Sequence, residues 1–264
     1  MREGRHLVVL RFPPRIRDVE QDMEHKGKKY LCGVGVGPGD PKLLTLAAAE
    51  TIRTADLVLA PTSYKDEPGR AEEIVKKAIG NIPIRRILFD MTKGKSGIEL
   101  RKSAALIAAR EIVNLLQPGG KAAFLTIGDP NVFSTFNLIA NSVSSIDPGV
   151  EISSIPGIMA FQDLVSRTGM TLLDEEESLR LLVGLQVDSK IEEALMDDSS
   201  AVVIYKGGSN LSAIVEMAKK TGRLAEGWIG VKIGLEESEV TTLQSVGDGP
   251  VGYLSTVIFP PKRH

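Results

Sequence analysis

Histidine and cysteine are almost missing from this chain of 264 residues. It contains one cysteine, Cys32, and three histidines, His6, His25 and His264, which all lie near the two ends of the sequence. A disulfide needs a second cysteine, and a zinc cluster or a Ser–His–Asp relay needs histidine or cysteine within the body of the chain. We therefore expect no resident metal ion, and any chemistry must use other side chains or a bound cofactor.

A strong net charge and long hydrophobic runs are also missing. The chain has 32 basic and 34 acidic side chains, which give a formal net charge of -2, so no bulk field attracts nucleic acid or an anionic membrane. No apolar stretch approaches the length of a membrane-spanning helix. The short apolar stretch at 6–14 ends in a proline pair, unlike the core of a signal peptide. We expect a cytoplasmic globular protein that binds neither nucleic acid nor membranes.

Apolar strands alternate with amphipathic helices from Tyr30 onward. Strands are predicted at 30–36, 57–61, 84–91, 122–127 and 150–155, with helices after a cap at Asp40 and at 71–79, 98–117 and 133–143. Wholly apolar strands separated by helices are typical of a parallel sheet that is covered on both faces. This pattern predicts a first α/β domain at 29–155, preceded by an extension at 1–28 with one short strand at 7–10.

The rhythm of the sequence changes near Pro156. A helix is predicted at 158–168, strands at 179–184, 201–206, 227–234 and 253–260, and one clear helix among these strands at 211–221. No helical pattern joins the last two strands, so we expect them to pair antiparallel. The predicted fold class is α/β with two domains, the first with a mainly parallel sheet and the second, at 156–264, with a mixed sheet.

Three turns rich in small residues follow predicted strands: GVGPGDP at 35–41, TIGDPNVFST at 126–135 and SIPGIMAF at 154–161. The first does not fit a dinucleotide fingerprint, because Pro38 and Asp40 stand where its last glycine is needed. The KGKSG segment at 93–97 fails as a phosphate loop, because Phe89 replaces the first glycine of that motif. One such loop alone is as easily a tight turn without a ligand. Three of them at the carboxyl ends of strands predict a cleft lined mainly by backbone.

Several segments resemble the tetrapyrrole (corrin/porphyrin) methylases, which use S-adenosylmethionine. They are GVGVGPGDPKLLTLAAAETIRTADLVLAP, GDPNVFSTF and PGIMAFQDLVSRTGMTLL, and the similarity extends over about 30–259. Within that family, GDPNVFSTF and VIYKGGSNLSAIVEMA are most similar to the enzymes that methylate C20 of precorrin-2, or of its cobalt-containing counterpart, in cobalamin biosynthesis. The resemblance implies two α/β domains with the cofactor in the cleft between them, a homodimer, a tetrapyrrole acceptor and S-adenosylhomocysteine as product.

The resemblance also implies a set of residues around the cofactor. Carried over position by position, these are Pro38, Ile127, Gly128, Asp129, Val132, Ser134, Thr135, Met159, Ala160, Tyr205, Lys206 and Gly234. Among them, Tyr205, Lys206 and Gly234 would cover the adenosine, and Met159 stands where the family commonly has a small hydroxylated residue. The resemblance implies no metal ligand, and no catalytic residue is assigned. A sulfonium-bound methyl group is already activated, so the protein need only hold it in line with an electron-rich ring carbon.

Alternative roles remain open for some of these residues. Asp129 could equally cap the following helix, and so could the hydroxyl groups of Ser134 and Thr135. The acidic segment at 174–178 is typical of a solvated loop, although it could border the acceptor. Basic side chains would have to meet the carboxylates of the acceptor. The candidates are Lys65, Arg70, Lys93, Lys95, Arg101 and Lys102, with Tyr64 as a ring that could stack on the macrocycle.

Rival functions for the whole chain also remain open. It could be another member of the same family, such as a methylase of a different corrin carbon or a diphthine synthase. It could also be a non-catalytic nucleotide-binding module that kept the cleft without turnover. A nicotinamide-dependent dehydrogenase is disfavoured, because the dinucleotide fingerprint fails.

Overall fold

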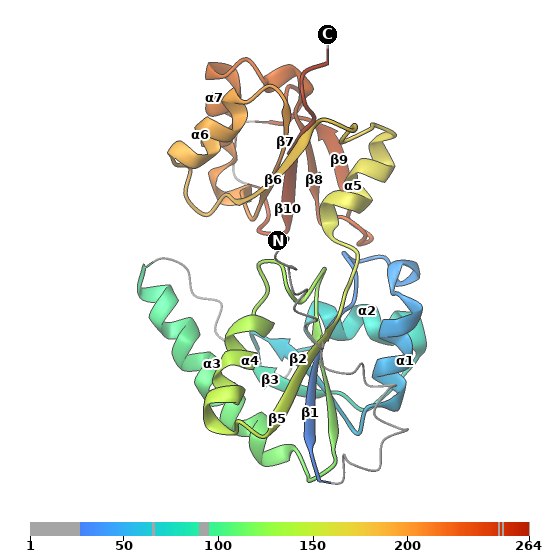
Figure 1. Cartoon of the computed structure of the whole chain (residues 1–264). Coiled ribbons are helices and arrows are strands. Elements are labelled where there is room, and N and C mark those ends of the chain that lie inside the picture. The colour runs from blue at the N-terminus through green and yellow to red at the C-terminus, as the bar shows by residue number, and fades with distance from the viewer. Residues whose placement is uncertain (1–26, 65–66, 90–94, 248, 250, 264) are drawn as a thin grey trace, which may run out of the picture. The chain divides into compact units, whose positions relative to one another are not determined.

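The computed structural model describes residues 27–64, 67–89, 95–247, 249 and 251–263. The described chain forms two compact units, one made of 27–35 and 46–156 and the other of 36–45 and 157–263 (Figure 1). The expected strand at 7–10 and nearly all of the expected extension lie outside the described residues. No helix in the part of the chain that the structure describes is long and apolar enough to cross a membrane.

The first unit is built on a five-stranded parallel sheet. Its strands are β1 (Lys29–Gly35), β2 (Leu57–Thr62), β3 (Arg85–Leu88), β4 (Lys121–Thr126) and β5 (Val150–Ile155). Their order is β3-β2-β4-β1-β5, and every neighbouring pair runs parallel. This arrangement confirms the parallel sheet that the apolar strands predict.

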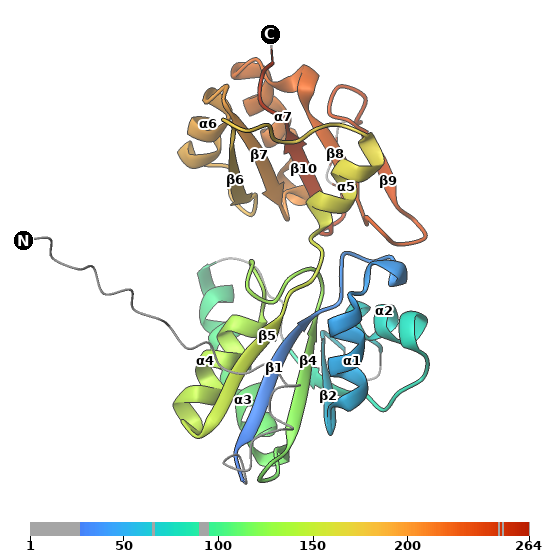
Figure 2. The ribbon, with the colours of Figure 1, turned by 45° about the vertical axis from the view of Figure 1, so that its right-hand side comes forward.

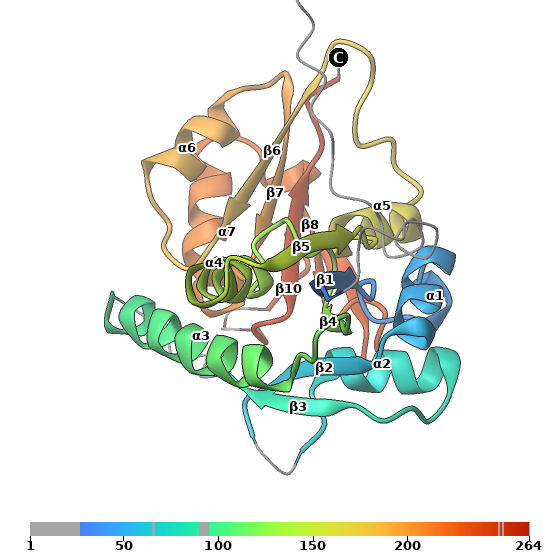
Figure 3. The same cartoon turned by 60° about the horizontal axis from the view of Figure 1, so that its bottom comes forward.

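Helices cover both faces of this sheet. They are α1 (Leu46–Thr54), α2 (Arg70–Ile79), α3 (Lys95–Leu115) and α4 (Phe136–Ile146). The chain runs from β1 through β2 to β3 at one edge and then returns through β4 to β5. Because crossovers between parallel strands are right-handed, the two directions place α1 and α2 on one face and α3 and α4 on the other (Figure 3).

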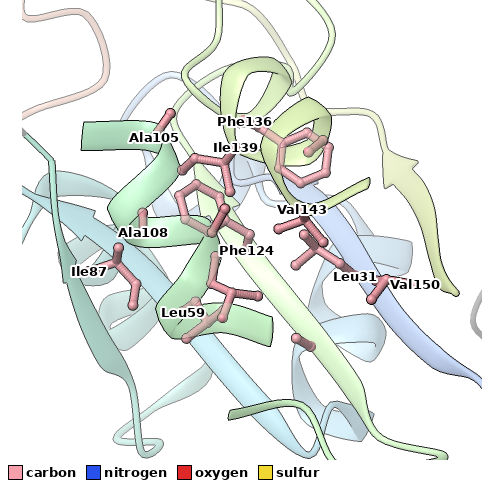
Figure 4. Packing of buried hydrophobic residues seen from close by; sticks show 14 of the residues in the cluster. Leu31, Leu59, Ile87, Ala105, Ala108, Phe124, Phe136, Ile139, Val143 and Val150 are labelled. Atoms are coloured by element: carbon pink, nitrogen blue, oxygen red, sulfur yellow. The ribbon is translucent and has the colours of Figure 1, made fainter. Parts of the chain in front are cut away.

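A hydrophobic core lies between the sheet and helices α3 and α4. Leu31 and Phe124 from the strands pack there with Ala108 of α3 and Ile139 of α4 (Figure 4). Alanine on α3 lets that helix lie close to the sheet, and the rings of Phe124 and Phe136 are 6.0 Å apart between centroids. The first turn of α4 is therefore fixed above β4, and the loop that joins β4 to α4 is held at both ends.

The second unit contains a mixed five-stranded sheet (Figure 2). Its strands are β6 (Ser178–Val183), β7 (Ser200–Tyr205), β8 (Trp228–Val231), β9 (Glu239–Thr242) and β10 (Ser255–Phe259). The order is β6-β7-β10-β8-β9, in which β6 and β7 are parallel and the other neighbours are antiparallel. The mixed sheet and the antiparallel pairing of β8 with β10 are thus confirmed.

Helices pack on both faces of the second sheet as well. Helix α5 (Ala160–Thr168) covers one face, where Leu164 packs with Ile233. Helices α6 (Ser189–Met196) and α7 (Leu211–Lys220) cover the other, where Ile191 and Ile214 pack with Phe259. Each face of the sheet therefore has its own hydrophobic cluster.

Two local expectations are wrong, and a third, the helix cap at Asp40, holds only for a shorter helix than expected. Helix α6 lies between β6 and β7, so the helix at 211–221 is not the only one among these strands, and β9 lies between β8 and β10 along the chain. Both missed elements are short, with eight and four residues, which leaves too little sequence for a clear period. Asp40 caps a short 3-10 turn, Pro41–Leu43, and α1 begins only at Leu46.

Candidate functional site

Three strands of the first unit end side by side at one edge of the sheet. In the register of the sheet, Gly35 of β1 pairs with Thr126 of β4, and Val34 of β1 pairs with Ile155 of β5. The three turns rich in small residues therefore leave from neighbouring strand ends. In open parallel sheets, this edge is where ligands bind.

The topology singles out the end of β4. This strand lies between β2 and β1. Its own connection leads to α4 on one face, whereas the connections after β1 and β2 lead to α1 and α2 on the other face (Figure 3). Ligands of doubly wound sheets bind where neighbouring connections diverge in this way.

Side-chain hydrogen bonds hold the loop between β4 and α4 in place. The Asn131 side-chain amide Nδ2 donates to Ser154 Oγ on β5 over 3.0 Å, and the Asn131 backbone N–H donates to Asp129 Oδ1 over 2.8 Å. Ser134 Oγ lies 3.0 Å from Thr126 Oγ1 on β4 and accepts from the Phe136 N–H over 3.1 Å. The loop is thus anchored to two strands of the sheet and to the start of the helix.

The same loop brings together the predicted cofactor residues of the first unit, which are Ile127, Gly128, Asp129, Val132, Ser134 and Thr135. Helix α4 begins at Phe136, and Thr135 occupies its N-cap position without a side-chain hydrogen bond to the helix. Asp129 lies too far before the helix to cap it and instead closes a local turn onto Asn131. The capping role for Asp129 and Thr135 is therefore wrong, whereas Ser134 does satisfy the first N–H of the helix.

The segments that follow β4, β7 and β8 adopt uncommon backbone conformations. Gly128 has a φ of 68°. Among the described residues other than glycine, a positive φ occurs at Phe133 (49°), Lys206 (60°) and Lys232 (51°). For residues other than glycine, this left-handed backbone conformation is unfavourable by about 1–2 kcal/mol. Residues held in such conformations cluster at functional sites, and all three lie in or beside predicted site segments.

The glycine-rich turn after β1 belongs to the second unit. A Cβ atom on Gly39 would lie 2.6 Å from the Ile233 carbonyl oxygen, and one on Gly234 would lie 2.5 Å from the Asp40 nitrogen. Only glycine allows backbones to approach so closely. Pro38, the residue before Gly39, is thereby placed beside the segment that contains Gly234. The structure brings these two predicted residues together, although they are far apart in the sequence.

The other predicted residues of the second unit lie in the same region. Met159 and Tyr205 pack in one hydrophobic cluster with Ile233, and Ala160 is the first residue of α5. Met159 is the N-cap residue of α5, and its backbone N–H donates to the Gln162 side-chain oxygen Oε1 over 2.8 Å. Burial raises the pKa of Tyr205 to about 12, so this hydroxyl keeps its proton to higher pH than an ordinary tyrosine does.

Lysines follow the ends of β7 and β8 in matching positions. The Lys206 N–H donates to the Ser255 carbonyl over 3.1 Å, and the Lys232 N–H donates to the Leu254 carbonyl over 2.7 Å. Both N–H groups therefore hold the entry of β10 between them. The Lys206 ammonium lies 5.9 Å from the centre of the Tyr253 ring, and the Lys232 ammonium pairs with Glu237. Sequence reasoning missed Lys232, because no residue pattern reveals a left-handed lysine.

The candidate acceptor residues are more scattered. Tyr64 is 68% exposed after β2, and Arg70 begins α2. Lys102 pairs with Glu99 within α3, at 3.0 Å. Lys95 begins α3 and Arg101 lies within it, whereas Lys65 and Lys93 are outside the described residues.

The acidic segment at 174–178 has a structural partner. Glu177 pairs with Arg263 at 2.6 Å, and hydrogen bonding to this guanidinium lowers the pKa of the Glu177 carboxyl. The same arginine donates to the Thr171 carbonyl over 2.7 Å. Within the described ranges, no group of three or more His, Cys, Asp or Glu side chains could hold a metal ion.

Comparison with known proteins agrees with this picture. The model of the family "Tetrapyrrole (Corrin/Porphyrin) Methylases" matches residues 30–247. A Methanocaldococcus jannaschii protein named "Probable cobalt-precorrin-2 C(20)-methyltransferase" is 32% identical over 67% of this chain and 72% of its own. A Sinorhizobium protein named "Precorrin-2 C(20)-methyltransferase" is 28% identical over 90% of this chain and 98% of its own.

Solved structures share the fold. The cobalamin synthesis related protein CobF from Corynebacterium diphtheriae superimposes with a TM-score of 0.64 at 17% identity, over 88% of this chain and 98% of its own. The cobalt precorrin-4 methyltransferase CbiF superimposes with a TM-score of 0.62 at 13% identity, over 88% of this chain and 94% of its own. The two α/β units with one parallel and one mixed sheet therefore follow a known architecture.

Proposed function

We propose a function for this chain from the family to which it belongs, the tetrapyrrole (corrin/porphyrin) methylases. It transfers a methyl group from S-adenosylmethionine to C20 of precorrin-2 or of cobalt-precorrin-2. The reaction would be a step of cobalamin biosynthesis. The names of the relatives from Methanocaldococcus and Sinorhizobium support this acceptor and this carbon. The structural observation that carries the proposal is the register of β1, β4 and β5, which end side by side where three turns of small residues begin.

The residues of these turns fit S-adenosylmethionine. A Cβ atom on Gly128 would meet nothing within 4 Å, so no neighbouring atom of the protein blocks the approach of a ligand to the loop backbone there. Backbone N–H groups suit the carboxylate and the adenine edge of the cofactor, and carbonyl oxygens suit a methyl group bound to sulfur. The residues that would hold the cofactor are the set that the family resemblance implies, from Pro38 to Gly234.

The chemistry asks little of the side chains. S-adenosylmethionine supplies, when bound, a methyl group that is already activated by its sulfonium. The loops need to orient it toward the acceptor carbon and exclude competing nucleophiles. The described part of the chain contains no histidine. Tyr205, with its raised pKa, stays neutral. The proton that leaves C20 would pass to water or to a carboxylate of the acceptor.

Two further expectations are part of the proposal. We expect a homodimer, as the resemblance implies, and a cytoplasmic location, as the composition predicts. Sedimentation of the purified chain checks the first, and fractionation of cells that produce it checks the second.

Incubation with methyl-labelled S-adenosylmethionine tests the reaction. Metal-free precorrin-2 and cobalt-precorrin-2 are offered separately, and mass spectrometry and NMR locate the added methyl group. We expect one methyl group at C20 of at least one acceptor, together with S-adenosylhomocysteine. Label at another ring carbon would reassign the chain within its family. Cofactor binding without label in either acceptor would favour a non-catalytic module and contradict the proposal.

A further inference from the structure

Phe133 combines two unfavourable features at the predicted cofactor loop. Its φ is 49°, a conformation that a bulky side chain rarely adopts. It is also 44% exposed, whereas the other described phenylalanines are at most 8% exposed. A sequence that only had to fold would place glycine or asparagine at such a position. Exposure and backbone strain at one aromatic residue together indicate a function.

The surrounding loop holds the Phe133 backbone in this conformation. On one side, Asn131 is tied to Ser154 on β5 over 3.0 Å. On the other side, Ser134 is tied to Thr126 on β4 over 3.0 Å and to the first N–H of α4. The chain on both sides of Phe133 is thus anchored to the sheet. The backbone that carries the exposed ring is therefore fixed to the sheet.

The position of Phe133 in the chain limits which part of a bound ligand its ring could contact. It lies between Val132 and Ser134, two residues that the family resemblance places at the cofactor, and beside the end of β4 where doubly wound sheets bind ligands. The same resemblance assigns the adenosine to Tyr205, Lys206 and Gly234 of the second unit. The flat group left for a ring on the β4 loop is then the macrocycle of the acceptor.

We propose that the Phe133 ring stacks on the tetrapyrrole macrocycle and helps to position the acceptor for methyl transfer. The acceptor of the proposed function is a large conjugated ring with carboxylate side chains, and an aromatic ring packs on such a surface by offset stacking. Because the backbone on both sides of Phe133 is already anchored, the loop loses little freedom when the acceptor binds. This inference rests on the proposed function for the class of acceptor, but not on which carbon is methylated.

Direct binding measurements test the inference. The probes are uroporphyrin III, a stable tetrapyrrole rich in carboxylates, followed by fluorescence, and S-adenosylhomocysteine, followed by calorimetry. We expect Phe133→Ala to weaken porphyrin binding about 5- to 20-fold and to leave the Kd for S-adenosylhomocysteine within about twofold. Phe133→Tyr should keep both affinities. Ile146→Ala is the matched control, since Ile146 is 38% exposed at the other end of α4.

Phe133→Gly separates a role in binding from a role in folding. Glycine relieves the positive φ, so this variant should melt no lower than the wild-type protein, yet it should bind the porphyrin as weakly as Phe133→Ala. Kinetically, both variants should raise KM for precorrin-2 more than they lower kcat. Unchanged or higher stability together with a loss of acceptor affinity is a result that a purely structural role does not give.

Several results would overturn the inference. The first is that the wild-type protein does not bind the porphyrin, and the second is that the Phe133 variants bind it as tightly as the wild type. The third is that these variants lose affinity for S-adenosylhomocysteine as much as for the porphyrin, which would mean that the ring covers the cofactor. The proposed function can be contradicted independently of the role of Phe133. If the wild-type protein methylates another carbon while Phe133→Ala still loses porphyrin affinity, the role of Phe133 stands and the C20 assignment falls.

Discussion

Gly39 and Gly234 lie with their backbones in direct contact, although almost two hundred residues separate them in the sequence. A side chain on either would clash, because the Cβ atom of Gly39 would lie 2.6 Å from the Ile233 carbonyl oxygen and that of Gly234 would lie 2.5 Å from the Asp40 nitrogen. This contact ties the turn after β1 to the segment after β8. Two of the residues predicted at the cofactor, Pro38 and Gly234, are thereby held in one place.

Gly39→Ala should therefore weaken cofactor binding. The added methyl group must push the turn away from Ile233, which we expect to cost about 1–3 kcal/mol of folding stability. The same shift moves Pro38, so the Kd for S-adenosylhomocysteine should rise roughly tenfold. Thermal melting and calorimetry measure the two effects. Gly247→Ala is the control, since a Cβ there would meet nothing within 4 Å; normal affinity in Gly39→Ala would contradict the role of the contact.

The hydroxyl pair on the β4 loop offers a second test. Ser134 Oγ lies 3.0 Å from Thr126 Oγ1 and accepts from the Phe136 N–H. Ser134→Ala removes both hydrogen bonds and should destabilise the protein by about 1–2 kcal/mol. Thr126→Val removes only the bond between the hydroxyls and keeps the shape of the buried side chain.

Comparing these two variants separates loop anchoring from cofactor contact. If Ser134 also contacts the cofactor, Ser134→Ala should raise the Kd for S-adenosylhomocysteine several-fold more than Thr126→Val does. If both variants weaken binding equally, Ser134 acts only by holding the loop. Calorimetry at one temperature and buffer gives the comparison, and urea unfolding shows how much stability each variant has lost.

The sequence predicts the architecture well, because the architecture follows from composition over whole segments. Strands such as β4, with five of its six residues buried, carry an apolar signal that needs no knowledge of their neighbours. The strand order, however, depends on the direction in which each crossover connection moves along the sheet. The residues of a single strand do not determine that direction. Short elements such as α6 are missed for the same reason that isolated short helices are unstable: tertiary packing holds them.

For the candidate site too, some features can be predicted from the sequence and others cannot. The glycine-rich turns can be found in the sequence, because three of them follow predicted strands. That the turn after β1 packs with the second unit is set by a contact with Gly234, which no local pattern contains. The left-handed backbone conformations of Phe133 and Lys232 cannot be predicted from the sequence either, since neither residue type favours them. Only the tertiary structure imposes that conformation.

Arg223 should be critical for stability rather than for binding. Its side chain is fully buried, pairs with Glu226 at 3.1 Å and donates to the carbonyl groups of Leu195 and Pro260. Arg223→Met leaves these acceptors unsatisfied and should lower the free energy of unfolding by about 3–5 kcal/mol. Urea unfolding measures the change.

An exposed arginine provides the contrast for Arg223. Arg85 pairs with Glu111 at 2.7 Å on the surface of the first unit, and Arg85→Ala should cost less than about 1 kcal/mol. Similar losses in the two variants would mean that the buried network around Arg223 contributes little. Arg223→Lys should lie between them, because it keeps the charge but loses the planar fork of donors.

Tyr205 should make the protein less stable in alkali. Burial raises its pKa to about 12, whereas a tyrosine in the unfolded chain keeps its ordinary pKa of about 10. Both states hold the phenolic proton below about pH 10, so the stabilisation is fully present there. As the pH rises from about 10 through about 12, the unfolded chain releases this proton first, and stability falls by up to about 2–3 kcal/mol.

Tyr205→Phe should remove this part of the pH dependence. Chemical unfolding of both proteins at intervals from pH 8 to 12, a range chosen around the ordinary tyrosine pKa of about 10, gives the difference in stability at each pH. We expect the difference to be constant below about pH 10 and then to shift in favour of Tyr205→Phe, because phenylalanine has no proton to lose. Parallel curves up to the highest pH would show that Tyr205 ionises normally in the folded protein. A buried, neutral phenol beside Met159 and Ile233 could then no longer be assumed in the cofactor region.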